Sequence, residues 1–278
     1  MPELPEVETI VRGLRGAIVG ERIQAVDIRL AKIAQAPPGV DFARALIGET
    51  ITGVTRRAKY AVLELASGRR LVTSLRMTGR LVVGKPGEVA YPGTHIVFTL
   101  KPLKTLSFAD IRTFGRMRLV EPGDPWDANL GPEPLEKAFT PEAFVSMLSE
   151  RTTSIKVLLL DQRRIAGIGN IYACEALWEA KIRPSTPAKD LSRAAMIRLH
   201  GALIEVLSRA VEMRGSSIDD YVDADGLRGG FQNVLAVYGR LGQPCTRCGT
   251  PIQRSVLAGR GTWWCRMCQP RSRKKIRK

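Results

Sequence analysis

Hydrophobic and polar positions follow two different periods along this chain, and the change of period divides it. Near the start, apolar residues recur at the spacing of one helix face: Leu4, Val7, Val11 and Leu14. Short apolar or alternating runs then predict strands, with Gly and Pro between them, at Arg22 to Arg29, Val54 to Leu65, Arg70 to Leu75, Leu81 to Val83, His95 to Leu100 and Arg116 to Val120. Strands this short and closely spaced favour an antiparallel sandwich, against which the first helix would pack.

The second half has a helical period. Proline and glycine interrupt residues 121–141, which we interpret as a linker. Beyond it, apolar spacing predicts helices at Pro141 to Glu150, Ser154 to Leu160, Ile168 to Ala180 and Leu191 to Arg214. Residues 215–233 are rich in Gly, Ser and Asp, which is typical of either a binding loop or plain disorder. The pattern thus predicts an α+β fold, with a helix and β-sandwich over 1–120 and a helical domain over 142–240.

Charge indicates the kind of partner. The 43 Lys and Arg residues exceed the 27 Asp and Glu residues, giving a net charge of +16, and this excess favours a polyanion such as nucleic acid. An acidic membrane is the alternative, but no segment approaches about 18 uninterrupted apolar residues. The first ten residues also include three glutamates, unlike a signal peptide. We therefore expect a cytoplasmic protein that binds nucleic acid and no membrane.

Four cysteines predict a metal site. Cys245 and Cys248 form one C-x-x-C pair, and Cys265 and Cys268 form a second one 16 residues later. Two such pairs are typical of a tetrahedral Zn²⁺ site, and four thiolates leave no open position, so one structural zinc is expected to hold a hairpin over 241–270. Disulfides are the alternative, although nothing suggests secretion. Residues 271–278 form a basic tail that would add nonspecific affinity for DNA.

The chain start offers a nucleophile. If Met1 is removed, Pro2 carries a free secondary amine with the carboxylates of Glu3 and Glu6 close behind it. An α-amine has a pKa of about 7.7 to 8.0, so a useful fraction is neutral near pH 7. Condensation with a sugar aldehyde would give a cationic iminium, suited to β-elimination. An ordinary helix start, where Pro and Glu are common, explains the same residues.

A glycine-rich turn lies between two predicted helices, at residues 167–172. Its glycines would let backbone N–H groups approach a phosphate, and Asn170 suits the N-cap of the next helix. A plain helix-breaking turn has the same composition.

Four separated motifs together resemble one family. PELPEVET at 2–9, RRAKY at 56–60, GIGNIYACE at 167–175 and the C-x-x-C pairs are similar to formamidopyrimidine-DNA glycosylase, and the resemblance spans essentially the whole chain. It implies a bifunctional base-excision enzyme that removes oxidised purines from damaged double-stranded DNA and cleaves the strand by β,δ-elimination. It also implies a helix-two-turn-helix element in the helical domain, a four-cysteine zinc finger and a basic cleft for DNA.

The resemblance gives roles to individual residues. Pro2 would attack C1′ of the damaged nucleotide, Glu3 would act as the acid and base in proton transfers, and Glu6 would be a supporting carboxylate. Lys59 would complete the catalytic set and contact a phosphate beside the lesion. Further phosphate contacts are implied for Lys156, Asn170 and Arg260. The space left by the extruded base would be filled by Met77, Arg112 and Phe114, although the sequence pattern alone assigns Met77 and Phe114 to the core. The 215–233 loop would close over the extruded base.

Other functions stay open at this point. Endonuclease VIII-type relatives act on oxidised pyrimidines, and a zinc-ribbon protein could bind DNA with no catalysis. A metallohydrolase is less favoured, because His95 and His200 are isolated and the cysteine quartet is coordinatively closed.

Overall fold

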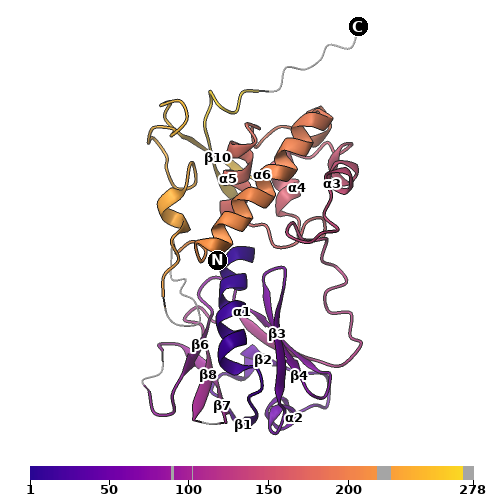
Figure 1. The fold of residues 1–278 in the computed structure, drawn as a ribbon, viewed down its shortest axis with the longest axis vertical. Helices are drawn as coiled ribbons and strands as arrows, with labels where there is room; N and C mark the ends of the chain where they lie inside the picture. The colour runs from indigo at the N-terminus through magenta and orange to yellow at the C-terminus, as the bar shows by residue number, and fades with distance from the viewer. Residues whose placement is uncertain (89–90, 102, 218–226, 272–278) are drawn as a thin grey trace. The chain divides into compact units, whose positions relative to one another are not determined.

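A computed structural model describes residues 1–88, 91–101, 103–217 and 227–271. The chain forms two compact units (Figure 1). Unit 1 consists of Met1–Ala128 together with Val211–Gln232, and unit 2 consists of Asn129–Ala210 together with Asn233–Lys278. The segment that joins unit 1 late in the chain includes residues 215–232 of the predicted lesion loop, of which 218–226 lie outside the described residues.

Unit 1 contains two sheets. One has the order β1-β7-β8-β6 and the other β2-β9-β5-β4-β3. The strands are β1 (Ile23–Ile28), β2 (Ala34–Gln35), β3 (Ile51–Arg57), β4 (Tyr60–Leu65), β5 (Arg70–Ser74), β6 (Arg80–Gly84), β7 (Thr94–Leu100), β8 (Lys104–Ala109) and β9 (Arg116–Val120). All pairings are antiparallel except that of β2 with β9. The predicted antiparallel architecture is confirmed, while the single run at Val54 to Leu65 is two strands joined by a turn.

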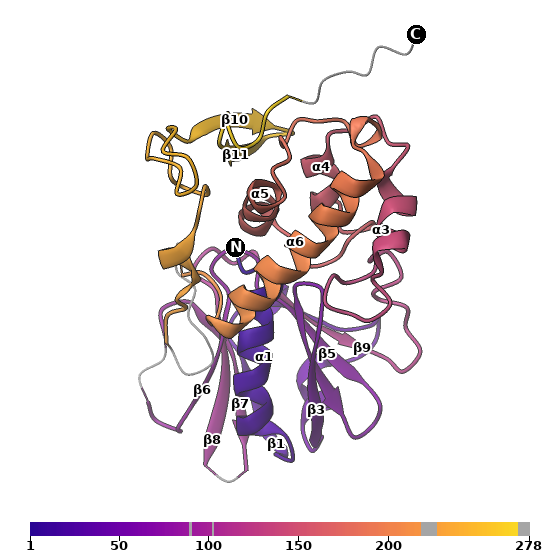
Figure 2. The same cartoon turned by 45° about the horizontal axis from the view of Figure 1, so that its top comes forward.

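Helix α1 (Leu4–Ile18) organises the core of unit 1. Its apolar face is fully buried, including Val7, Val11 and Leu14. The helix packs against β3, β4 and β6, which belong to both sheets, and strands of the two sheets flank it in Figure 2. Because its side chains join the same hydrophobic core as both sheets, the first turn of α1 is held in a fixed place. Unit 1 also contains the 3₁₀ turn η1 (Ala31–Ile33) and the short helix α2 (Phe42–Leu46).

Unit 2 is helical with a terminal hairpin. Its elements are α3 (Pro141–Leu148), α4 (Ile155–Leu160), α5 (Asn170–Glu179), η2 (Ala188–Asp190), β10 (Gln253–Leu257) and β11 (Arg260–Trp264). Two further elements, α6 (Arg193–Glu212) and η3 (Phe231–Val234), cross from one unit to the other along the chain. Helix α5 packs against α4 and β11 (Figure 2), so the start of α5 lies beside the hairpin. His200 is buried in α6, where its Nε2 donates to the carbonyl of Phe139 at 2.7 Å, a structural role.

None of the helices in the described part of the chain combines the length and apolar character needed to cross a bilayer.

Candidate active site and DNA interface

Three of the four residues predicted for catalysis lie at the start of α1. Pro2, Glu3 and Glu6 are all buried. Glu3 has extended backbone before the helix, and its N–H donates to Glu6 Oε2 at 2.7 Å. An acidic residue three positions into a helix commonly satisfies this orphan donor. The local sequence thus fixes the backbone of Glu3, and with it the direction of Pro2.

Glu6 also reaches a segment that is distant in sequence. Its Oε1 accepts the backbone N–H of Ser216 at 2.7 Å, across 210 positions of chain. Gly215 makes this approach possible, because a Cβ there would lie 2.8 Å from Glu6 Oε1 and its φ is +76°. The buried carboxylate therefore joins the start of α1 to the base of the predicted lesion loop, a contact that sequence reasoning did not predict.

The base of this loop is closed by backbone hydrogen bonds. The N–H of Gly230 donates to Met213 O at 2.8 Å, and the N–H of Phe231 donates to Gly215 O at 3.0 Å. The N–H of Gly229 donates to Ser217 Oγ at 2.9 Å. These bonds fix both ends of the loop within unit 1.

Lys59 lies at the tip of a two-residue hairpin turn. Arg57 pairs with Tyr60, so Ala58, with a φ of 53°, and Lys59 connect β3 to β4. Arg56 supports the turn from below: its Nη1 donates to Ala58 O at 3.1 Å and its Nε to Glu8 Oε2 at 2.9 Å. Since Glu8 belongs to α1, this chain of contacts links the Lys59 turn to the helix that begins beside Pro2.

Electrostatics keep Glu8 ionised. Burial acts to raise the pKa of Glu8, but the guanidinium groups of Arg56 and Arg12 outweigh it and hold the pKa below its ordinary value. The pair with Arg56 is largely buried, which limits screening by solvent.

The three residues predicted to fill the space left by an extruded base, hereafter the void-filling residues, lie on two surface loops of unit 1 and are Met77, Arg112 and Phe114. Met77 is 40% exposed and Phe114 is 51% exposed, so the core positions that the pattern alone assigns to them are wrong. The guanidinium of Arg112 lies 5.0 Å from the ring centre of Phe114, in cation–π geometry. The N–H of Arg112 donates to Thr78 Oγ1 at 3.2 Å, which joins the two loops.

Asn170 and Lys156 meet at one carbonyl in unit 2. Asn170 is the first residue of α5, with Gly169 at the N-cap position. Its Nδ2 donates to the carbonyl of Gly261 at 3.0 Å, and Lys156 Nζ donates to the same oxygen at 2.9 Å. Gly261 follows Arg260, which is exposed at the first position of β11. The geometry therefore couples Asn170 to the hairpin that carries Arg260.

Lys156 is the predicted contact whose position differs most from expectation. Its side chain is fully buried, and its Nζ also donates to Thr262 Oγ1 at 2.7 Å. A buried ammonium needs such partners, because leaving water without them is costly. This burial argues against the direct phosphate contact expected of Lys156 and favours a role in holding β11 against α4.

The four cysteines are arranged for one metal ion. All four Sγ atoms lie within 4.8 Å of one another, with 3.9 Å between Cys245 and Cys268 and 3.5 Å between Cys248 and Cys265. A tetrahedral zinc with bonds of about 2.3 Å needs sulfur separations near 3.8 Å, so the quartet fits Zn²⁺. Trp178 on α5 donates its indole N–H to Cys245 Sγ at 3.4 Å, which ties the site to the helical part of unit 2.

The fifth cysteine has a different environment. Burial is the main cause that raises the pKa of Cys174 to about 11, so its thiol stays protonated at neutral pH. It packs among the apolar residues behind the hairpin.

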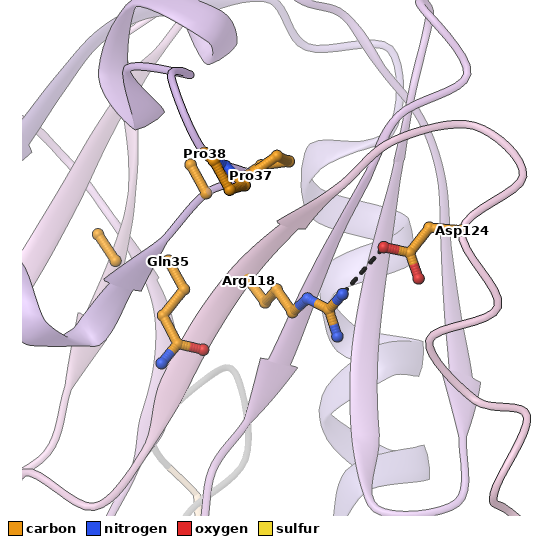
Figure 3. A pocket seen from close by; sticks show the side chains of 7 residues that line it. Gln35, Pro37, Pro38, Arg118 and Asp124 are labelled. Atoms are coloured by element: carbon orange, nitrogen blue, oxygen red, sulfur yellow. Dashed lines mark hydrogen bonds and ion pairs between the residues drawn. The ribbon is translucent and has the colours of Figure 1, made fainter.

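An open pocket in unit 1 lies beside β2 and has a volume of about 570 Å³ (Figure 3). Gln35, Pro37, Pro38, Arg118 and Asp124 are among the residues that line it. Arg118 Nη2 pairs with Asp124 Oδ2 at 2.9 Å, so these two charges satisfy one another. The lining contains none of the predicted site residues, and this pocket has no part in the candidate site.

Three family models match the chain in succession. The formamidopyrimidine-DNA glycosylase N-terminal domain matches residues 1–117, and the formamidopyrimidine-DNA glycosylase H2TH domain matches residues 130–222. The zinc finger found in FPG and IleRS matches residues 242–271.

Full-length relatives agree with these matches. The formamidopyrimidine-DNA glycosylase of Desulforamulus reducens is 45% identical over 97% of this chain and 99% of its own length. That of Geobacillus kaustophilus is 44% identical over 97% and 100%.

Solved structures have the same fold. A Lactococcus lactis FPG mutant in complex with a Fapy-dG containing DNA has a TM-score of 0.90 and 37% identity, covering 97% of this chain and 100% of its own. The MutM (FPG) protein of Thermus thermophilus has a TM-score of 0.87 and 43% identity, covering 96% and 98%.

Proposed function

Because the chain belongs to the formamidopyrimidine-DNA glycosylase family, we propose that it excises oxidised purines from duplex DNA through a Schiff base on Pro2. The observation that carries this proposal is the start of α1, where Pro2, Glu3 and Glu6 are all buried and the N–H of Glu3, the residue after Pro2, donates to Glu6 Oε2 at 2.7 Å. Removal of Met1 is a condition of the mechanism, since it exposes the secondary amine.

The reaction begins at the sugar. The neutral nitrogen of Pro2 attacks C1′, the bond from C1′ to the base breaks, and the base leaves with a proton. Glu3 assists by transferring a proton to the ring oxygen as the sugar opens. The product is an iminium between Pro2 and C1′, whose positive charge cannot be lost by deprotonation because the nitrogen has no hydrogen left.

The iminium then serves as an electron sink. Loss of a C2′ proton expels the 3′ phosphate by β-elimination, and loss of a further proton expels the 5′ phosphate by δ-elimination. Hydrolysis of the remaining adduct regenerates the amine and leaves a one-nucleotide gap. Zinc supplies structure only, because the four cysteines occupy all its positions.

DNA binding in this proposal uses residues of both units. Lys59 on the hairpin turn, with Asn170 and Arg260, would contact phosphates. The void-filling residues would occupy the stack after the base is extruded, which offsets part of an unstacking cost of a few kcal/mol. We further propose that the protein acts as a cytoplasmic monomer and that residues 215–233 cap the extruded base.

Borohydride trapping tests the proposal. Incubation with an 8-oxoguanine duplex and borohydride should give a covalent protein–DNA adduct, whereas Pro2→Gly lowers its yield and a chain that retains Met1 gives none. Pro5→Ala, one turn away in α1, is the matched control and should retain trapping.

Duplexes that carry formamidopyrimidine or thymine glycol test the preference for purines. An intact, zinc-loaded chain that binds DNA but forms no adduct would favour the non-catalytic alternative. A preference for thymine glycol would favour the endonuclease VIII-type alternative.

A further inference from the structure

The void-filling residues pose a mechanical problem. Met77 lies in the loop between β5 and β6, and Arg112 and Phe114 lie in the loop between β8 and β9. Side chains that enter a base stack must keep their position although the bases on either side tend to restack. Exposed loops are usually the most mobile parts of a protein. Something must therefore fix these loops to unit 1.

Asp110 meets that need through its side chain. It is fully buried, although it immediately follows β8 at the surface loop. Its Oδ2 accepts the N–H of Gly115 at 2.6 Å, and its Oδ1 accepts the N–H of Arg112 at 3.3 Å and the hydroxyl of Thr78. One carboxylate thus binds both sides of the loop that carries Arg112 and Phe114, together with the loop that carries Met77.

The backbone of Asp110 is fixed as well. Its N–H donates to Gly93 O at 2.8 Å, and its carbonyl accepts the N–H of Thr113 at 3.0 Å and His95 Nε2 at 2.9 Å. The bonds with Gly93 and His95 attach the residue to the start of β7. The carboxylate consequently has a rigid base from which to hold the two loops.

Close packing around the carboxylate gives independent support. A Cβ at Gly115 would lie 2.6 Å from the Phe108 ring and 3.1 Å from Asp110 Oδ2. A Cβ at Gly79 would lie 2.3 Å from the carbonyl of Leu75. At Gly115, the loop that carries Arg112 and Phe114 therefore packs against Phe108 more closely than a residue with a side chain would allow. Gly79 instead lets the Met77 loop turn tightly on its own backbone at Leu75.

We propose that Asp110 and Thr78 are positioning residues that lock the two void-filling loops into one rigid wedge. The inference rests on the proposed function, because it assigns the wedge to the space left by an extruded base. Neither residue touches DNA in this proposal. Asp110 holds the backbone at both ends of the Arg112 to Phe114 turn, and the Thr78 hydroxyl bridges that turn to the Met77 loop.

The first experiment measures the loops without DNA. Thr78→Val keeps the shape of the side chain but removes the hydroxyl, and Thr78→Ser keeps the hydroxyl as the matched control. Amide hydrogen exchange at Arg112 should accelerate roughly 3- to 10-fold in Thr78→Val and remain near wild type in Thr78→Ser. Asp110→Asn should accelerate the exchange of the Gly115 amide as well. The NH₂ group of asparagine cannot accept a hydrogen bond, so a backbone N–H that faces it loses its acceptor. Equal exchange in all four proteins would overturn the inference.

The second experiment measures excision. Single-turnover removal of 8-oxoguanine should slow at least about tenfold in Thr78→Val, with little change in Thr78→Ser. The fluorescence of 2-aminopurine beside the lesion reports how the stack is filled and should change in parallel. In a Phe114→Ala background the further effect of Thr78→Val should shrink, since both changes disable the same wedge.

The two proposals fail in different ways. If wild-type protein forms the borohydride adduct and Thr78→Val excises at the wild-type rate, the positioning role is wrong. Full additivity of Thr78→Val with Phe114→Ala would also overturn it. If wild-type protein forms no adduct, the proposed function is wrong, and hydrogen exchange then decides whether Thr78 and Asp110 hold the loops.

Discussion

Glu175 offers a sharp test of what holds unit 2 together. This carboxylate on α5 is only 4% exposed. Its Oε2 accepts the N–H of Ala236 at 2.7 Å, and its Oε1 accepts those of Val237 at 3.0 Å and Tyr238 at 2.8 Å. Burial raises the pKa of Glu175, which the three N–H donors partly oppose. The side chain attaches residues 236–238 to the helix.

Glu175→Gln should be strongly destabilising although it changes almost no volume. An amide has one acceptor oxygen, so its NH₂ group must face at least one of the backbone N–H donors. Leaving that donor unsatisfied costs about 1 to 3 kcal/mol, and the two remaining bonds each lose about 1 kcal/mol of charge assistance. We expect a loss of about 3 to 5 kcal/mol, which corresponds to a decrease in Tm of about 6 to 20 °C.

Thermal unfolding followed by circular dichroism, with zinc present, measures this effect. Glu179→Gln is the matched control, because Glu179 lies one turn further along α5 and forms an exposed ion pair with Arg247 at 3.0 Å. Loss of this ion pair should lower the free energy of unfolding by at most about 1 kcal/mol. Hydrogen exchange at residues 236–238 should accelerate only in Glu175→Gln. Equal Tm values for the two variants would refute the reasoning.

Three further results are expected. Chelation of zinc, or Cys248→Ser, should unfold the hairpin and weaken DNA binding in a mobility-shift assay; chelated protein with full affinity would contradict this. The pKa of Glu8 is lowered beside Arg56, so the ionised carboxylate contributes to stability above its ordinary pKa of 4.5, and this contribution is lost as the pH falls through the folded-state pKa. Glu8→Gln should therefore make the free energy of unfolding depend less on pH in the acid range. Phe114→Ala should change the free energy of unfolding by less than about 1 kcal/mol in urea, whereas buried Phe98→Ala should cost about 3 to 5 kcal/mol; similar values for both would refute the assignment of Phe114 to the surface.

Local patterns predicted the parts of the fold that depend on neighbouring residues. The helical spacing of Leu4 to Leu14 predicted α1, and the two C-x-x-C pairs predicted the metal site. Strand β2 was not predicted, because two residues are too few to show a period. The turn inside Val54 to Leu65 was not predicted, because Ala58 adopts the positive φ that usually indicates a glycine.

Long-range contacts account for what the pattern could not show. Lys156 is buried because its partners lie more than a hundred positions away on β11, and nothing near it in sequence indicates this. Met77 and Phe114 are large apolar residues, which are usually buried in a core, and only the tertiary structure shows that both side chains are exposed. The motif resemblance predicts a functional role for both, because a motif is tied to one three-dimensional fold whereas local periodicity is not.

The contact between Glu6 and Ser216 has a consequence for biosynthesis. As the polypeptide leaves the ribosome, residues 1–128 emerge long before 211–232, which belong to the same compact unit. Until that later stretch arrives, the Glu6 carboxylate lacks one of its backbone donors. A shortened gene product ending at 128 would keep this deficit permanently, so the start of α1 reaches its finished environment only in a chain that extends through residues 211–232.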